Sequence, residues 1–407
     1  MIQMTEGGIC AAKGFRAAGM HCGIRPGKTK KDLALIVSDV PCQAAAVFTA
    51  NLVKGAPILV DQAHLRDGVA QAVVCNSGIA NTCNADGLEK AEKMAALAAE
   101  AAGLRPEDVI VGSTGVIGEP LNLDPVEAAL PELVKRLQRS ADASDDAEHA
   151  IMTTDTRPKS VAVEFGIDGV TCRLGGIAKG SGMIHPDLAT MLVFLTTDCA
   201  ITSGMLEKAL KQDVRNTFNM ISVDGDTSTN DTCCILASGL AGNPVIREEG
   251  PAYSEFMKAL NTVTVALCRM IAGDGEGATR LLECRLTGAA IEETAKKLAK
   301  SVICSSLVKS AMFGADANWG RILCAMGYAG VPFDVNGVDV CFSSAAGRVP
   351  VCRDGAGIPF SEEKAKEVLS EPEVDILITL HEGDAEATAW GCDLTYDYVK
   401  INGDYRT

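Results

Sequence analysis

Aromatic residues are scarce in this chain of 407 residues, since Phe, Trp and Tyr together make up 4% of it. The core must therefore be built mainly from Ala, Val, Ile and Leu side chains. Basic residues are outnumbered as well, with 37 Lys and Arg against 53 Asp and Glu, which gives a formal net charge of -16. Nucleic-acid binding needs clustered positive charge. We therefore expect no nucleic-acid partner.

Long hydrophobic runs are also missing. No window approaches the roughly 20 apolar residues of a membrane span, and Met1–Arg25 lacks the continuous apolar stretch of a signal peptide. The 16 cysteines are spread along the chain without a Cys-x-x-Cys pair, which favours reduced thiols over a disulfide framework. We expect a cytoplasmic protein with no membrane partner.

Several motifs of cofactor and metal sites are absent. In Gly175–Ser181, Lys179 precedes the glycine that it should follow in a phosphate-binding P-loop. Gly273–Gly277 does not fit a dinucleotide-binding loop and predicts a tight turn. The five histidines are scattered, and the chain has no Gly-x-Ser-x-Gly elbow. We expect neither a metal nor a cofactor.

Helical and strand patterns mix along the whole length, which predicts an α/β fold in layers. The expected helices are Gly87–Ala102, Pro131–Arg139, Gly204–Phe218, Pro251–Ile271 and Ala290–Val302. The expected strands are Asp108–Val111, Ser160–Phe165, Met191–Thr196, Val338–Phe342, Val374–Leu380 and Leu394–Ile401. The length allows two or three domains.

A glycine-rich segment leads through His185 and Pro186 into the apolar strand after Thr190. A threonine hydroxyl becomes a nucleophile if its own α-amino group accepts the proton, which requires a cut in the chain before it. An α-amine titrates near about 8 and a lysine near about 10.4, so the α-amine offers roughly a few hundred-fold more free base near neutrality. From composition alone, however, an ordinary strand position remains the favoured interpretation of Thr190.

The segment Lys179–Leu192 resembles the cleavage and nucleophile motif of the ornithine acetyltransferase family, whose members are bifunctional arginine-biosynthesis enzymes. The resemblance covers almost the whole chain. It is carried further, in order, by Lys13–Gly19, Cys75–Gly78, Ala80–Asn84, Gly112–Gly118, Ile151–Thr156, Ser222–Thr232, Phe313–Arg321 and Ile401–Thr407.

The resemblance implies self-cleavage of the Ala189–Thr190 bond, with Thr190 as the N-terminal nucleophile. The Thr190 hydroxyl would attack the carbonyl of Ala189 and form an ester, which water would then release. The fragments would be 1–189 and 190–407. They would jointly form a layered α/β core from 1–189 and 190–284, with a C-terminal α/β domain over 285–407. An α₂β₂ assembly is the family expectation.

The resemblance also implies the site residues. Thr114 and Gly115 match the oxyanion-hole pair, and the positions that match substrate-binding residues are Thr153, Lys179, Thr190, Glu276, Asn402 and Thr407. Lys179 would neutralise a substrate carboxylate and Glu276 would pair with an ammonium. Without the motif context, Gly112–Gly118 would be a loop after a strand. The two charged residues would then be surface groups, and the last residues a frayed tail.

The implied reaction is a ping-pong transfer of acetyl from N-acetylornithine to glutamate through Thr190. Acetyl-CoA is a second donor in some members. Two alternatives stay open: a self-processing aminopeptidase or amidohydrolase of similar fold, in which water accepts the acyl group, and a non-catalytic binding protein descended from the enzyme.

Overall fold

The computed structural model describes residues 2–25, 27–185 and 191–404. The chain divides into two compact units. Unit 1 takes Met1–Gly180, Asp187–Arg215 and Thr227–Leu267, and unit 2 takes Ser181–Pro186, Asn216–Asp226 and Cys268–Thr407. The predicted boundary at residue 285 lies inside a strand of unit 2. The predicted division between residues 189 and 190 is a site of chain cleavage and not a boundary between compact units, and it stays a prediction.

Unit 1 is built on a nine-stranded mixed sheet, in the order β1-β6-β7-β8-β10-β3-β4-β5 with β2 beside β3. Its strands are β1 Gln3–Thr5, β2 Phe15–Met20, β3 Leu33–Phe48, β4 Val69–Ile79, β5 Val109–Val116, β6 Ser160–Ile167, β7 Val170–Lys179, β8 Leu192–Thr197 and β10 Thr232–Ala237. Its helices are α1 Ala56–His64, α2 Gly87–Ala102, α3 Asp124–Lys135, α4 Ala141–Ile151 and α5 Ser203–Val214. Helix α6, Pro251–Gly273, begins in unit 1 and ends in unit 2.

Two hydrophobic clusters hold unit 1 together. In one, the apolar faces of α2 and α3 pack against β3, β4 and β5. The other uses the opposite side chains of β3 and β4 with α4, β8 and β10. The alternation of side chains along a strand explains how β3 and β4 contribute to both clusters. The strands β5 and β7, whose ends carry predicted site residues, are anchored by side chains in these clusters.

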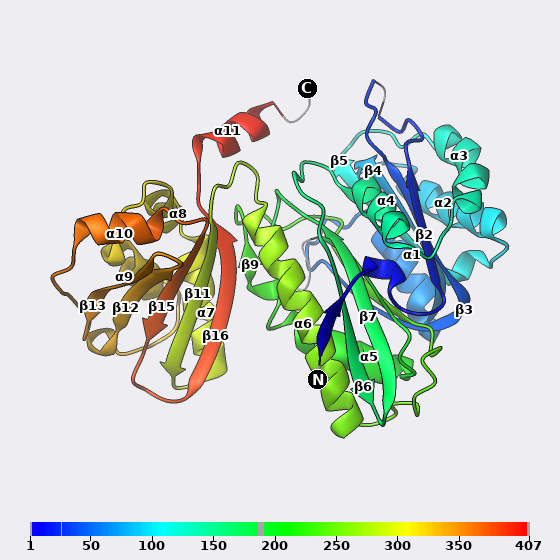
Figure 1. Ribbon diagram of the computed structural model, residues 1–407. Coiled ribbons are helices and arrows are strands. Elements are labelled where there is room, and N and C mark those ends of the chain that lie inside the picture. Colours follow the sequence, from blue (N-terminus) through cyan, green and yellow to red (C-terminus); the bar gives the residue numbers. More distant parts are fainter. Residues whose placement is uncertain (1, 26, 186–190, 405–407) are drawn as a thin grey trace. The chain divides into compact units, whose positions relative to one another are not determined.

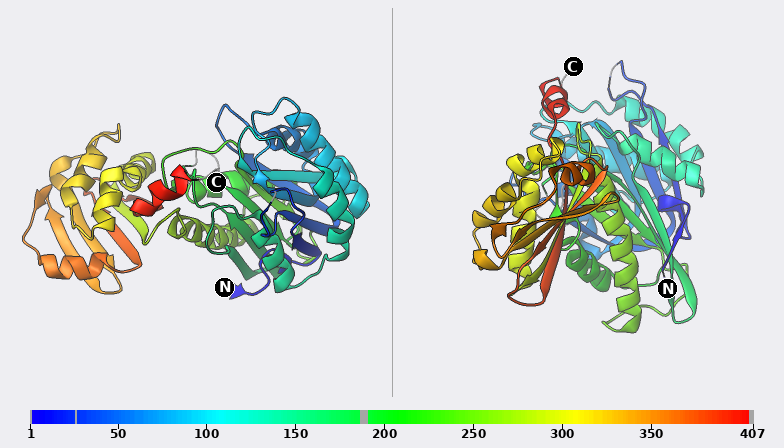
Figure 2. Two further views of the ribbon diagram at one scale, coloured as in Figure 1. Left: turned by 90° about the horizontal axis from the view of Figure 1, so that it is seen from above. Right: turned by 60° about the vertical axis from the view of Figure 1, so that its left-hand side comes forward.

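Unit 2 is built on a seven-stranded sheet, in the order β14-β13-β12-β15-β11-β16-β9. Its strands are β9 Ile221–Ser222, β11 Leu281–Ala289, β12 Asp339–Ser344, β13 Gly347–Arg353, β14 Ala356–Gly357, β15 Glu373–Thr379 and β16 Ala385–Cys392. Its helices are α7 Glu292–Cys304, α8 Ser306–Phe313, α9 Trp319–Gly327, α10 Glu362–Leu369 and α11 Tyr396–Gly403. Except for β9, these strands come from the last third of the chain, coloured yellow to red in Figure 1 and Figure 2.

One face of the unit 2 sheet is buried. Cys284, Phe342 and Ile376 lie side by side on three neighbouring strands and are all fully buried, whereas Arg285, on the opposite face, is exposed. This alternation is typical of a sheet with one covered face. Short 3₁₀ turns complete the fold: η1 Gly8–Cys10, η2 Leu65–Asp67, η3 Pro106–Asp108, η4 Phe218–Met220 and η5 Val335–Gly337.

The α/β fold class is confirmed, as is the helix over Gly87–Ala102, but several predicted elements differ from the structure. Helix α5 ends at Val214 and not at Phe218, and strand β5 continues to Val116 and not only to Val111. Helix α3 starts at Asp124 and not at Pro131, because Asp124-Pro125 supplies a helix start and Pro131 is accommodated inside the helix. The predicted strand over Leu394–Ile401 is wrong. It is helix α11, whose apolar side chains are largely exposed rather than buried in a sheet.

Candidate active site

The C-terminal end of β5 carries Thr114 and Gly115. These residues pair in parallel register with Ser77 and Gly78 of β4, so the expectation of a loop at this point was wrong: the ladder continues to Val116. Gly115 has φ +128°, and a Cβ there would lie 2.2 Å from the carbonyl carbon of Gly78. Only glycine fits this approach of the two strands.

Two buried polar side chains support the same strand ends. The Ser113 hydroxyl donates to Asn76 Oδ1 at 2.6 Å, and Asn76 Nδ2 donates to the Ile79 carbonyl at 2.9 Å. Asn76 and Ser113 are almost fully buried. A buried amide or hydroxyl without a partner would be costly, so these bonds favour one arrangement of the β4 and β5 ends.

Asp155, in the segment after α4, bonds to the backbone at two places that the resemblance assigns to substrate binding: at Thr153 and directly after Lys179. Its carboxylate accepts from Lys159 Nζ at 2.7 Å, from the Gly180 N–H at 2.7 Å and from the Thr153 N–H at 3.0 Å. Burial alone would raise the pKa of Asp155, but the nearby charges of Lys179 and Lys159 and the hydrogen bonds hold it well below its usual range. The carboxylate is therefore ionised and fixes Thr153 beside the end of β7.

Lys179, the last residue of β7, is buried rather than a surface charge. It pairs directly with Leu192 of β8, the second residue after Thr190. Buried lysines need a compensating negative charge, and Asp155 supplies one in the same unit. The Lys179 side chain is therefore held in the interior of unit 1, on the strand next to the one that follows the predicted nucleophile.

Glu276 and Asn402 meet within unit 2. Asn402 Nδ2, on α11, donates to Glu276 Oε2 at 2.7 Å. Glu276 is buried, and its backbone N–H donates to the Ser181 carbonyl at 3.0 Å. Without the motif context, Glu276 would be expected as an exposed surface charge and Asn402 as part of a frayed tail. Neither description fits, because Glu276 is buried and Asn402 lies on α11. An orienting amide on a buried carboxylate suits recognition of a substrate ammonium.

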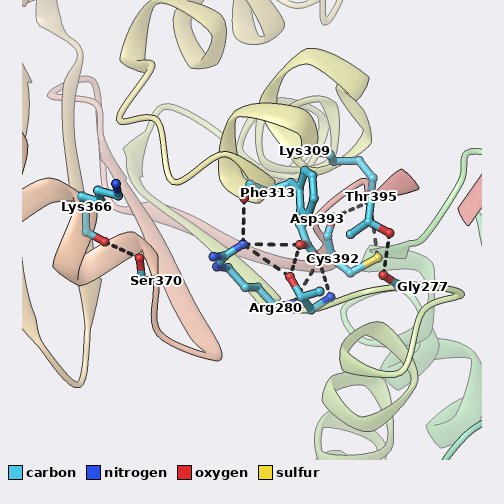
Figure 3. Close-up of polar contacts among 10 residues, drawn as sticks. Gly277, Arg280, Lys309, Phe313, Lys366, Ser370, Cys392, Asp393 and Thr395 are labelled. Carbon is cyan, nitrogen blue, oxygen red and sulfur yellow. Dashed lines mark hydrogen bonds and ion pairs between the residues drawn. The ribbon is translucent and has the colours of Figure 1, made fainter. Parts of the chain in front are cut away.

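The loop after Glu276 is fastened to the chain that leads into α11 (Figure 3). Asp393 accepts from the backbone N–H groups of Thr279 at 2.8 Å and Arg280 at 3.0 Å, and also from the Thr279 hydroxyl. The Thr395 hydroxyl donates to the Gly277 carbonyl at 2.7 Å. These contacts keep the strand end of β16 and the Glu276 loop in one arrangement.

Comparisons with known proteins show the family to which the chain belongs. A model of the ArgJ family matches residues 16–407. The chain belongs to the ArgJ family. It is 49% identical to the arginine biosynthesis bifunctional protein ArgJ of Caldanaerobacter subterraneus subsp. tengcongensis and 51% identical to that of Symbiobacterium thermophilum, with 100% of each chain covered in both cases. A solved structure of argJ from Bacillus halodurans is 45% identical, with a TM-score of 0.49; the match covers 52% of this chain and 97% of that chain.

The predicted site residues of this ArgJ-family chain fall into three groups. Thr114, Gly115, Thr153 and Lys179 lie in unit 1, and Glu276 and Asn402 lie in unit 2. Ala189, Thr190 and Thr407 lie outside the described residues. After the gap the described chain resumes at Met191, whose carbonyl accepts from the Thr232 N–H at 2.9 Å.

Sequence reasoning missed Asp155 and Asn76 as supports of the site. Both lie in segments that carry the family resemblance, and their place in these motifs could have marked them as site residues. Their roles depend on partners from other strands, and these pairings cannot be read from one segment. Among the described residues, no group of three or more His, Cys, Asp or Glu side chains could hold a metal ion. No helix in the described ranges is long and apolar enough to cross a bilayer.

Proposed function

We propose that this chain is a glutamate N-acetyltransferase of arginine biosynthesis that cuts itself between Ala189 and Thr190. The observation that carries the proposal is the match to relatives named as bifunctional arginine-biosynthesis proteins over the full length of both chains. The buried side chain of Lys179 and the glycine-dependent approach at Gly115 support it, because acyl transfer needs fixed polar groups around a nucleophile.

In the first half-reaction the Thr190 hydroxyl attacks the acetyl carbonyl of N-acetylornithine. The α-amine of Thr190 takes the hydroxyl proton and passes it to the departing ornithine amine. Thr114 and Gly115 stabilise the negative oxygen of the tetrahedral intermediate. The product of this step is acetyl-Thr190 and free ornithine.

In the second half-reaction the α-amine of glutamate attacks acetyl-Thr190. Its proton returns to the Thr190 oxygen through the same α-amine, so the enzyme is restored. Lys179 pairs with a substrate carboxylate, and Glu276 with Asn402 binds the ornithine side-chain ammonium. Thr153 and Thr407 complete the set of substrate contacts.

The proposed reaction needs no resident cofactor. Acetyl-CoA serves as a second acetyl donor, which is in keeping with the bifunctional names of the relatives. We assign the enzyme to the cytoplasm, because the 16 cysteines are free thiols and most are buried. The two fragments stay associated as an α₂β₂ assembly.

N-terminal sequencing of the purified protein tests the proposal. We expect a second terminus beginning Thr-Met-Leu, and an uncut, inactive Thr190→Ala variant. Labelled acetylornithine with and without glutamate separates transfer from hydrolysis. Acetate release that does not depend on glutamate would favour the amidohydrolase, and an active protein with one unbroken chain would refute self-cleavage.

A further inference from the structure

Asn230, in the segment that precedes β10, uses its whole side chain in hydrogen bonds. Its Nδ2 donates to the Ala80 carbonyl at 2.6 Å and to the Ser113 carbonyl at 3.0 Å. Its Oδ1 accepts from the hydroxyls of Thr82 at 2.5 Å and Thr229 at 2.6 Å. A carboxamide has two donor hydrogens and two acceptor lone pairs, so four bonds exhaust its capacity. The side chain is also buried, which makes each bond hard to replace.

One of these bonds acts on the predicted oxyanion hole. The carbonyl of Ser113 and the N–H of Thr114 belong to one planar peptide unit. A bond from Asn230 to this carbonyl therefore fixes the direction of the Thr114 N–H. It also limits the rotation available to the next residue, Gly115, whose backbone is already in the left-handed region.

A second bond acts on the neighbouring strand. Ala80 directly follows β4, and its N–H donates to the Val116 carbonyl at the end of β5. Asn230 thus bonds both to β5, which carries Thr114 and Gly115, and to the residue that follows the neighbouring strand β4. Loss of its two N–H donors would release both at once.

The same short segment also reaches the strand after the predicted nucleophile. Thr232, two residues after Asn230, donates its N–H to the Met191 carbonyl at 2.9 Å and pairs in parallel register with Leu192. The segment from Asn230 to Thr232 therefore contacts the oxyanion-hole strands at one end and the residue after Thr190 at the other.

We propose that Asn230 is a positioning residue for acetyl transfer and for self-cleavage. It holds the Ser113–Thr114 peptide at a fixed spacing from the strand that begins after Thr190. This inference rests on the proposed function, in which Thr190 is the nucleophile and Thr114 and Gly115 stabilise the oxyanion.

Asn230→Asp is the sharpest test, because it keeps the size of the side chain and removes both N–H donors. Small displacements of reacting groups can cost about 10²-fold in rate, so we expect kcat per cleaved chain to fall by about 10- to 10²-fold. Cleavage should slow by a similar factor. KM for N-acetylornithine should change by less than about twofold, since Asn230 is not a predicted substrate contact.

The dependence of kcat on pH is a second measurement, and a purely structural role of Asn230 would leave it unchanged. The carboxyl group that replaces the amide in Asn230→Asp can still donate one hydrogen bond when it is protonated. Its ionised form can donate none and repels the two carbonyl oxygens. The ratio of variant to unsubstituted kcat should therefore fall as the pH rises.

Asn243→Asp is the matched control. Asn243 is a buried asparagine of the same unit, and its Nδ2 donates to the carbonyls of Ala200 at 3.2 Å and Pro244 at 2.8 Å. We expect it to lower the melting temperature while kcat and cleavage stay close to those of the unsubstituted protein. Thr82→Val, which removes one hydroxyl donor to Asn230, should lower kcat severalfold and tests the network if Asn230→Asp does not fold.

The outcomes separate this inference from the proposed function. An unsubstituted protein that neither cuts itself nor transfers acetyl would overturn both. A protein that does both, while Asn230→Asp keeps its kcat and cleavage rate, would overturn the positioning role alone. Equal losses of kcat in Asn230→Asp and Asn243→Asp would also overturn it, because a general structural defect would then explain them.

Discussion

In unit 1 the predicted site residues Thr114, Gly115 and Lys179 stand at the ends of paired strands, whereas in unit 2 Glu276 follows a helix and Asn402 lies on α11. The unit 1 positions are held by strand ladders and by buried side chains such as Asn76 and Asp155. The unit 2 pair depends on one direct hydrogen bond and on the Asp393 contacts nearby.

This difference matches two chemical tasks. Stabilising a tetrahedral oxyanion needs donors whose positions do not shift during the reaction, which a buried ladder provides. Recognising a flexible ammonium side chain needs a correctly placed charge but tolerates adjustment. We therefore expect substitutions at the paired ends of β4 and β5 to affect folding and turnover, and substitutions at the unit 2 pair to affect mainly substrate affinity.

The largest effect on stability is expected for Asp155→Asn. The Asp155–Lys159 ion pair has side chains that are 0% and 1% exposed, and removal of one partner from a buried pair costs about 3–5 kcal/mol in the free energy of unfolding. Urea unfolding measures this difference. The control is Glu207→Gln, which breaks the exposed Lys211–Glu207 pair and should cost about 0.5 kcal/mol or less. Similar losses in both variants would contradict a special role for Asp155.

Gly115→Ala should have the next largest effect, on activity. The new Cβ would clash with the Gly78 backbone at a φ that favours glycine, so the oxyanion pair must move. Loss of one such donor lowers kcat by about 10²–10³-fold, and assays of cleavage and acetyl transfer measure it.

Gly166→Ala is the control for this substitution. A Cβ at Gly166 meets nothing within 4 Å, so cleavage and transfer should be unchanged. Circular dichroism shows whether each variant keeps its fold. A folded Gly115→Ala variant with full turnover would show that the close approach of β4 and β5 is not needed for catalysis.

Glu148→Gln should change how the stability of unit 1 depends on pH. Neither carboxyl oxygen of Glu148 has a hydrogen-bond partner among the described residues. Burial, and to a lesser degree the charge of Asp145, raise the pKa of Glu148 to about 8. Between the unfolded value of about 4.3 and about 8, the folded state keeps a proton that the unfolded state has lost. Stability therefore falls as pH rises, by at most about 1.4 kcal/mol per pH unit.

The glutamine variant lacks this proton and should lose the corresponding slope. Its stability relative to the unsubstituted protein should grow from pH 5 to pH 7 in urea unfolding. Glu100→Gln, at an exposed position of α2, is expected to leave the slope unchanged. A constant difference across this range would mean that Glu148 is ionised in the folded protein.

The sequence alone predicted the α/β class and the helix Gly87–Ala102, because apolar spacing directly reflects which face is buried. It failed at Leu394–Ile401, where alternating apolar residues lie on an exposed helix. The resemblance supplied the site residues, yet not the burial of Lys179 or the supports from Asn76 and Asp155. These depend on partners from other segments of the chain, such as Ser113 of β5 beside Asn76 of β4. Periodicity within a segment carries no information about such partners.

The smallest effect is expected for Asn402→Ala, which tests the unit 2 side of the comparison. The variant removes the 2.7 Å bond to Glu276. Hydrogen bonds to charged groups contribute about 1.5–3 kcal/mol, and the exposure of α11 places this bond at the low end. KM for N-acetylornithine should rise about tenfold, with kcat changed by less than about twofold, because the bond orients a binding group and not the reacting atoms.

Lys400→Ala, an exposed position on the same helix, should leave KM unaltered. If instead Asn402→Ala lowered kcat and left KM unchanged, the unit 2 pair would belong to the chemistry, and the division of tasks between the two units would not hold.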